Sequence, residues 1–421
     1  MTHSTPKNLL KKAVRSSGKA SNHSHTPTSS RNASDFEDEV FSEGSDSTID
    51  SLSSFQDDWS IVDWNDEFKR IIEELSEKRT TTRESTLLKL IKALSHKFLD
   101  EDLQLQSESI IDTLKKCLKK SGSAREKILA SKAITLCFIT LGAGEESLYK
   151  DVSPILKNIV HNSAEPEVLS AAISALAMIC FIASSDEFET LKLMDMFAIV
   201  FKDSHKLTQA AISAINAHGL LFTTVSPRLG RSMFDSVMPV LTRLLESPNT
   251  ALRVASGENI ALMIETLRDD TSTNFRYDGI QNLTRSLTAL VTDSRKHRSK
   301  KDRSTQRSAF RDIVSSIEER NPPELKLKFR GEVITFTGWS EIKQLTAFRE
   351  ALAEGLHVHF QYNELLHDIF DVSLAPDAEG SSGYLPSLVV SPNSELSKLR
   401  TQGMAKQRQQ RSRYESFNED D

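Results

Sequence analysis

Cysteine is scarce in this chain of 421 residues, which contains only Cys117, Cys137 and Cys180. Each of the three lies in an apolar stretch with helical spacing, and none belongs to a CxxC pair or has a histidine at metal-ligand spacing. This pattern argues against a disulfide framework and against a structural zinc site. It predicts buried, reduced thiols in an intracellular protein.

Aromatic residues (7%) and glycines (15) are also few, and this composition favours helices over sheet. No run of about 18 apolar residues is present, so we expect no membrane span. The first residues lack the hydrophobic core of a secretory signal. Hydrophobic residues make up 38% of the chain, a low share for a chain that is globular throughout, so part of it is predicted to be disordered.

Motifs of catalysis are missing as well: the sequence has no GxxxxGK[ST], no GxGxxG after a strand, no HExxH and no GxSxG. The GxG within Leu141–Ser147 follows a helical pattern, so we interpret it as a helix C-cap. His357, His359 and His367 cannot share one metal ion on a continuous helix. We therefore predict a protein that is not an enzyme, with no metal site, no cofactor and no small-molecule substrate.

Charge is abundant but unevenly distributed. The net charge is −6, yet residues 1–34 carry six bases and no acid, and residues 35–58 carry nine acids and no base. Eight Lys/Arg residues against one Asp lie between Arg295 and Arg311, and six bases without an acid lie between Lys398 and Arg413. Local fields rather than the average charge steer a polyanionic partner, so the two late basic blocks are candidate contact sites.

An internal repeat dominates the middle of the chain. Three segments align without a gap at a spacing of 39 residues, "SKAITLCFIT" from Ser131, "SAAISALAMI" from Ser170 and "QAAISAINAH" from Gln209. Each carries an alanine followed by an isoleucine at the same place, and a looser fourth copy begins at Arg253. A period near 40 with two or more helices per unit is typical of armadillo and HEAT solenoids. Alanine on such a helix lets its neighbour approach closely.

The predicted fold is mainly α, an armadillo/HEAT-like α-solenoid followed by a small α+β C-terminal domain, with disordered termini. Paired prolines and the alternating "LKLKF" and "VITF" predict a hairpin with "RGE" at its turn, followed by helices over 340–355 and 357–370. The expected segments are 1–58 (disordered, Ser-rich, with an acidic end), 59–293 (armadillo-like repeats), 294–321 (basic amphipathic helix), 322–374 (C-terminal α+β domain) and 375–421 (mostly disordered basic tail).

The basic helix is predicted from "DSRKHRSKKDRSTQRSAFRDI", residues 293–313. Asp302 or Ser304 would cap it. An apolar stripe with helical spacing, Phe310, Ile313, Val314 and Ile317, should dock on the last repeat or on the C-terminal unit. The bases would then form a cationic ridge suited to phosphate backbones. A solvated basic face and a nuclear import signal are the alternatives. The ridge candidates for RNA binding are Arg295, Lys296, Arg298, Lys300, Lys301, Arg303, Arg307 and Arg311.

Three stretches resemble the interferon-related developmental regulator family: "REKILASKAITLCFITLGAGEES", "DGIQNLTRSLTALVTDSRKHRSKKDRSTQRSAFRDIVSSIEE" and "FTGWSEIKQLTAFREALAEGLHVHFQYNELLHDIFDV". The resemblance spans about residues 60–372 and implies an armadillo-like solenoid with a family-specific C-terminal domain. It also implies either binding to translationally inactive ribosomes or transcriptional co-regulation through corepressor complexes. The first role adds a second set of candidate RNA-binding residues, Lys398, Arg400, Lys406, Arg408, Arg411 and Arg413.

The resulting hypothesis is a ribosome-binding factor that occupies the tRNA and mRNA path of idle ribosomes and blocks or preserves them. Its partners would be ribosomal RNA and ribosomal proteins, with no membrane partner, in the cytoplasm and with nuclear residence left open. The rival hypothesis is a nuclear scaffold whose solenoid binds corepressor proteins.

Overall fold

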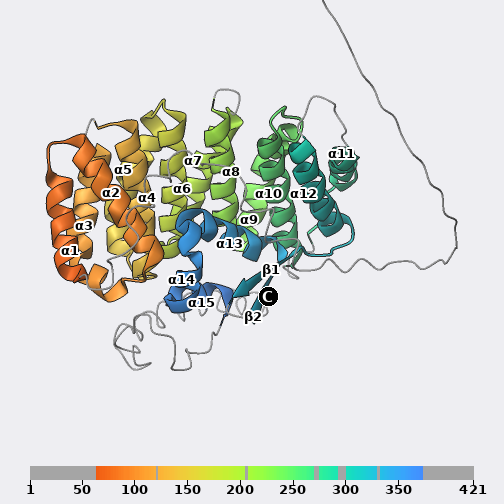
Figure 1. The fold of residues 1–421 in the computed structure, drawn as a ribbon. Helices are drawn as coiled ribbons and strands as arrows, with labels where there is room; N and C mark the ends of the chain where they lie inside the picture. Colours follow the sequence, from red (N-terminus) through yellow and green to blue (C-terminus); the bar gives the residue numbers. More distant parts are fainter. Residues whose placement is uncertain are drawn as a thin grey trace, which may run out of the picture. The chain divides into compact units, whose positions relative to one another are not determined.

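The computed structural model describes residues 63–119, 122–203, 207–269, 275–292, 300–329 and 332–372, all of which belong to one compact unit (Figure 1). The terminal segments for which disorder was predicted, 1–58 and 375–421, lie outside the described residues. The predicted domain boundaries stay predictions.

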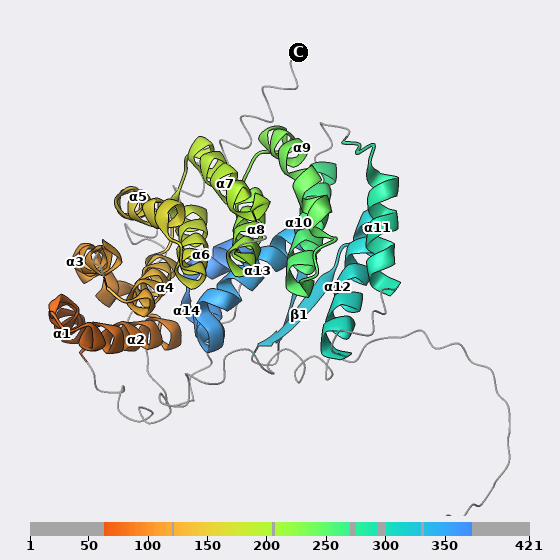
Figure 2. The same ribbon diagram turned by 90° about the horizontal axis from the view of Figure 1, so that it is seen from above.

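Helices of the solenoid pair in sequence order into hairpins, α1 with α2 through α11 with α12. The even-numbered helices then pack successively against one another, from α2 through α12, and form an inner layer along which α13 lies (Figure 2). Within the described residues the array consists of α1 (Trp64–Ser76), α2 (Thr80–His96), α3 (Asp100–Lys119), α4 (Ala124–Leu141), α5 (Glu146–Asn162), α6 (Pro166–Ala183), α7 (Glu187–Lys202), α8 (Thr208–Phe222), α9 (Pro227–Leu244), α10 (Thr250–Asp269), α11 (Ile280–Thr292) and α12 (Lys300–Glu318).

The repeated alanines explain the close stacking of this layer. Ala133, Ala172 and Ala211 lie on α4, α6 and α8 and are fully buried, as the repeat requires. Pro166 begins α6, where its missing N–H costs nothing. Asn249 precedes α10 and accepts a hydrogen bond at Oδ1 from the Leu252 backbone N–H at 2.9 Å. The prediction of a mainly helical armadillo/HEAT-like array is therefore confirmed.

A buried arginine fastens the first hairpin to the second. Arg83 on α2 donates to the carbonyl oxygens of Glu77 and Lys78 and to the Thr80 hydroxyl, which lie six, five and three residues before it. Its Nε also donates to Glu126 Oε1 on α4 at 2.6 Å, and both side chains are buried. The hydrogen bond that Arg83 donates to Glu126 raises the pKa of Arg83. Removal of either side chain would leave the other as an unpaired buried charge. The pair therefore holds α2 and α4 at the distance that this contact requires.

The last hairpins use the same arrangement. Arg253 on α10 donates to the carbonyl oxygens of Ser247 and Pro248 and to the Thr250 hydroxyl, again six, five and three residues before it. Arg253 also donates to Gln306 on α12, an uncharged group in place of the carboxylate. Both ends of the array thus join successive inner helices through an arginine that also closes the preceding turn.

One helix of the array differs from the expectation that no stretch is long and apolar enough to cross a membrane. Within the described residues α6 passes that test by length and composition, but 67% of it is buried inside the protein. It packs between α4 and α8. Core helices of repeat proteins are apolar on all sides for this reason.

The C-terminal segment begins with an antiparallel hairpin whose register pairs Glu324 with Thr337 and Phe329 with Glu332. The single helix predicted for residues 357–370 is wrong, because the chain breaks at Asn363. There the side chain accepts a hydrogen bond at Oδ1 from the Leu365 N–H and starts a new helix. The elements are β1 (Glu324–Phe329), β2 (Glu332–Thr337), α13 (Gly338–Leu352), the 3₁₀ helix η3 (Ala353–Gly355), α14 (Leu356–Tyr362) and α15 (Glu364–Phe370).

Candidate functional site

Helix α12 is anchored by its apolar stripe. Phe310, Ile313 and Ile317 are buried and Val314 is half-buried, against α10 and α11. A Cβ atom on Gly257 of α10 would lie 2.8 Å from the Phe310 ring, so only glycine permits this approach. The predicted docking on the last repeat is confirmed. The predicted start at Asp302 or Ser304 is wrong, because the helix already begins at Lys300. Lysine and arginine have high helix propensities, which favours helix over these first residues.

Gln306 extends the buried stripe by one turn, and the sequence interpretation missed it. The side chain is 2% exposed, accepts from Arg253, and donates from Nε2 to the Leu290 carbonyl oxygen of α11 at 2.9 Å. It lies four residues before Phe310, so its helical spacing matches the stripe, but a glutamine does not mark a buried position in an apolar pattern. The helix is thus held by apolar packing and by a buried polar contact to both neighbours.

Arg307 and Arg311 are exposed and lie along one flank of the buried stripe of α12, one helical turn apart. Neither forms an ion pair with a carboxylate in the part of the chain that the structure describes. We call these two residues the α12 ridge. Three further candidates lie in the first turn of the helix, and their side chains are not described: Lys300, Lys301 and Arg303. The remaining candidates lie outside the described residues: Arg295, Lys296, Arg298, Lys398, Arg400, Lys406, Arg408, Arg411 and Arg413.

Helix α13 crosses the inner layer and packs against α4, α8 and α10 (Figure 2). The buried Lys343 donates from Nζ to Asn216 Oδ1 at 3.2 Å and approaches Glu258 Oε2 at 3.4 Å. Farther along, the rings of Phe348 and Phe181 of α6 meet edge to face with centroids 6.2 Å apart. The C-terminal segment therefore lies across the face that successive repeats present. Sequence periodicity could not show this, because the contacts join residues far apart in the chain.

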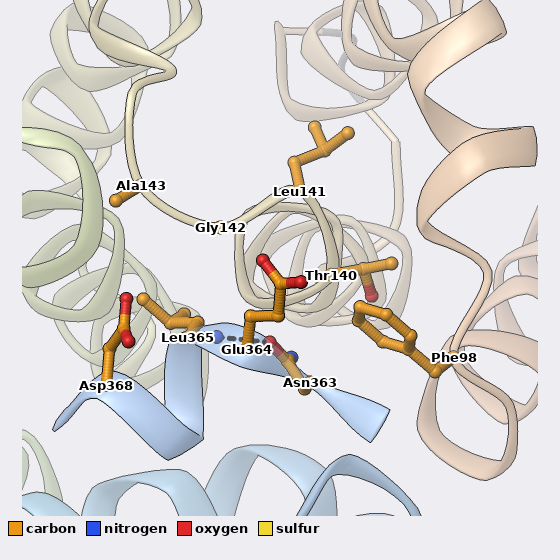
Figure 3. A pocket seen from close by; sticks show the side chains of 9 residues that line it. All are labelled: Phe98, Thr140, Leu141, Gly142, Ala143, Asn363, Glu364, Leu365 and Asp368. Carbon is orange, nitrogen blue, oxygen red and sulfur yellow. Dashed lines mark hydrogen bonds between the residues drawn. The ribbon is translucent and has the colours of Figure 1, made fainter. Parts of the chain in front are cut away.

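Two polar side chains join the end of this segment to the first repeats. His359 Nε2 lies 2.8 Å from the Leu94 carbonyl oxygen in the last turn of α2, and Asn363 Nδ2 donates to the Ile139 carbonyl oxygen in the last turn of α4 at 2.9 Å. Both satisfy carbonyls that a helix end leaves without a partner. Burial lowers the pKa of His359 to about 4, so the ring is neutral at physiological pH. Figure 3 shows Asn363 beside Phe98 and Leu365 in this joint.

Trp339 joins α13 to α10 and α12 at the other end. Its backbone N–H donates to Glu265 Oε1 at 2.6 Å, and its ring Nε1 donates to the Ser316 hydroxyl of α12 at 2.9 Å. Gly338 before it has a φ of 86°, and a Cβ there would lie 2.9 Å from the Glu265 carboxylate. Burial raises the pKa of Glu265 to about 7, even though hydrogen bonds from the backbone of Trp339 and Ser340 oppose that shift.

Replacing Glu265 by glutamine should change the pH dependence of stability. The folded pKa of Glu265 is about 7, whereas an unfolded glutamate titrates at about 4.3. Its contribution to stability is therefore complete below the unfolded pKa and is lost as pH rises through about 7. The free energy of unfolding of Glu265→Gln minus that of the wild type should rise over this window and then level off. Urea unfolding at several pH values measures the difference, and a pH-independent difference would contradict the assignment.

Catalytic chemistry finds no support in these groups. Within the described residues no three His, Cys, Asp or Glu side chains gather at metal-ligating distance. His359 and His367 bind backbone carbonyl oxygens, and His357 is exposed. The cavity drawn in Figure 3, between the end of α4 and α15, has a volume of about 20 Å³, too small for an organic substrate. The three cysteines are buried, as predicted.

The fold and the exposed basic helix define a class of protein, an armadillo/HEAT-like helical-repeat scaffold with its own C-terminal segment across the inner layer. The family model for the interferon-related developmental regulator matches residues 23–318. The chain belongs to this family.

Individual relatives agree. Interferon-related developmental regulator 2 of Mus musculus is 34% identical over 320 residues, which cover 72% of each chain. Interferon-related developmental regulator 1 of Homo sapiens is 31% identical over 364 residues, which cover 82% of this chain and 80% of the relative. Among solved structures, a designed armadillo repeat protein is similar over 58% of this chain and 98% of its own, with 16% identity and a TM-score of 0.37.

Proposed function

We propose that this protein is a non-enzymatic ribosome-binding factor. It would occupy the tRNA and mRNA path of translationally inactive ribosomes and so repress translation or preserve idle ribosomes. The observation that carries the proposal is the α12 ridge. Arg307 and Arg311 are exposed cations without carboxylate partners among the described residues, on a helix whose other side is buried. A solvated basic tail or a bare import signal does not need that buried side.

The expected mechanism is phosphate contact followed by steric occupancy. Arginine makes bidentate hydrogen bonds to phosphate oxygens, and each neutralised phosphate releases condensed counterions. A helix fixed by packing loses less conformational entropy on binding than a flexible arm does, so more of the contact energy is retained. Phe310, the aromatic residue within α12, is buried and therefore not available to bases beside Arg307 or Arg311. Contact with the backbone of folded RNA is therefore favoured over base stacking.

A second candidate function is that of a nuclear transcriptional co-regulator that binds corepressor proteins through the solenoid. The run "RKHRSKKDR" favours it, because its composition is that of an import signal. The inner layer is the obvious peptide-binding face of such a scaffold, yet α13 packs across α4, α8 and α10. A corepressor segment would have to displace α13 or use another face. Localisation of a tagged protein with and without residues 295–303 separates the two functions, and solely nuclear residence would favour the co-regulator.

Reversal of the ridge charges tests the ribosome proposal. We expect Arg307→Glu/Arg311→Glu to lower the affinity for purified ribosomes by at least about tenfold at moderate salt, because two phosphate contacts become repulsive. Co-sedimentation through a sucrose cushion measures it. The matched control is Lys69→Glu/Arg70→Glu, the same charge change at two exposed positions of α1. The control should bind like the wild type. Undiminished binding of the ridge variant would remove the assigned role of these residues.

A further inference from the structure

An open groove of about 710 Å³ lies where the end of α10, the beginning of α11 and the end of α12 meet. Among the described residues, its lining includes three arginines, Arg268, Arg285 and Arg320, and one acidic residue, Glu318. The groove is open to solvent, so this volume describes an accessible surface and not an enclosed pocket. These three cations and one anion give the described lining a positive balance. The groove is separate from the α12 ridge, since neither Arg307 nor Arg311 lines it.

The three arginines are held in different ways. Arg268 donates from Nη1 to the Ile317 carbonyl oxygen at the end of α12 at 2.8 Å, so it also serves the fold. Arg285 donates to Asn282 Oδ1 at 3.2 Å, a neutral acceptor. Burial and then the positive charge of Arg320 lower the pKa of Arg268, so these two cations are close enough to repel each other. Neither Arg285 nor Arg320 forms an ion pair within the described residues.

Arg320 occupies a backbone position that its side chain does not favour. Its φ is 54°, in the left-handed region, and the Asn321 N–H returns to the Ser315 carbonyl oxygen as in a helix C-cap. Glycine is the usual residue there, because a Cβ atom costs about 1 kcal/mol in this conformation. The negative end of the α12 dipole favours a cation beside the helix C-terminus, so the fold accounts for a positive charge here but not for the backbone cost of a Cβ atom. A ligand that uses the charge of Arg320 in the groove would offset that cost.

We propose that this groove binds a phosphate group, through Arg285 and Arg320 with support from the already bound Arg268. The Thr284 hydroxyl and the Gln281 amide line the same wall and offer further donors, whereas the Thr288 hydroxyl already donates to the Thr284 carbonyl oxygen. The first turn of α11 adds the partial positive charge of a helix N-terminus. The phosphate could belong to an RNA backbone or to a free phosphoryl compound, since both present the same oxygens. Only the first source rests on the proposed ribosome function.

Calorimetric titration of the full chain with sodium pyrophosphate tests the site itself. We expect Arg320→Gly to weaken binding by about tenfold, because a charge-assisted hydrogen bond is lost, while its unfolding midpoint rises by about 2 °C as the backbone relaxes. Arg320→Lys should lose less affinity, and Arg70→Gln, an exposed arginine on α1, none. Unchanged pyrophosphate affinity of Arg320→Gly and of Arg285→Gln would overturn the proposal. So would a fall in the midpoint that accompanies the loss of binding, because it would show a structural role.

A second arm identifies the source of the phosphate. Anisotropy of a labelled RNA duplex is measured with the same variants and with pyrophosphate as competitor. Parallel loss of duplex affinity, with competition, supports an RNA phosphate. Loss of pyrophosphate binding with unchanged duplex affinity supports a free phosphoryl ligand and overturns the RNA source. Failure of the ridge variant to lose ribosome binding would leave the pyrophosphate result standing, so the two proposals fail separately.

Discussion

Gly257→Val should destabilise the protein by about 3 kcal/mol and abolish the ordered presentation of the α12 ridge without changing any charge. A Cβ atom at this position would already lie 2.8 Å from Phe310 Cε1 and 2.9 Å from Ile313 Cδ1. The two extra methyl groups of valine leave no space for the apolar stripe, so α12 must move away from α10. Urea unfolding and ribosome co-sedimentation measure the two effects.

A compensating change serves as the control for this variant. Phe310→Leu removes the ring atoms that approach Gly257, so Gly257→Val/Phe310→Leu should regain part of the lost stability and of the ribosome affinity. The prediction fails if Gly257→Val is less stable than the wild type and nevertheless binds ribosomes with the same affinity. That result would mean that the bases act as a flexible chain and need no packed helix.

Gly355→Val is the second variant with a large expected effect, a loss of about 3 kcal/mol. A Cβ at Gly355 would lie 1.8 Å from the Ser95 carbonyl oxygen of α2, a backbone atom that cannot rotate away. The segment that follows carries His359 and Asn363, whose contacts with α2 and α4 should be lost together.

The consequence reaches beyond local stability. Repeat arrays normally make contacts only between neighbours, so their ends unfold separately. Here His359 contacts Leu94 across 265 positions of sequence, and Trp339 contacts Glu265 near the other end of the array. The C-terminal segment thus connects the last hairpins with the first. Gly355→Val should unfold in two steps where the wild type unfolds in one, and amide exchange on α14 and α15 should accelerate.

Gly142→Ala is the matched control for this change. Gly142 also lies near the joint, but a Cβ there meets no atom within 4 Å, and only its φ of 77° disfavours a side chain. We expect a loss of about 1 kcal/mol and unchanged protection of α14 and α15. Equal amide exchange in Gly355→Val and in the wild type would contradict the proposed docking.

The sequence predicted those features of the fold that recur at a regular spacing along the chain. The alanines at a spacing of 39 residues identified the inner helices, and Phe310, Ile313 and Ile317 identified the buried side of α12. What it did not predict depends on single polar groups that meet far from each other in sequence. At the break, Asn363 caps α15 and also donates to the Ile139 carbonyl oxygen, which lies 224 positions earlier in the chain. The course of α13 depends on pairs such as Lys343 with Asn216, and no repeat or spacing marks them.

A site-specific crosslink tests the central claim most directly. All three cysteines of the chain are buried. Ser308→Cys on the exposed side of α12 therefore provides a single accessible thiol beside Arg307, and Ser76→Cys does so on α1 as the control. Each variant is labelled with benzophenone maleimide, bound to purified ribosomes and irradiated. We predict crosslinks from position 308 to ribosomal RNA well above those from position 76. Ribosome binding of the labelled Ser308→Cys protein without RNA crosslinks above the control would contradict the assignment of α12 as the RNA contact.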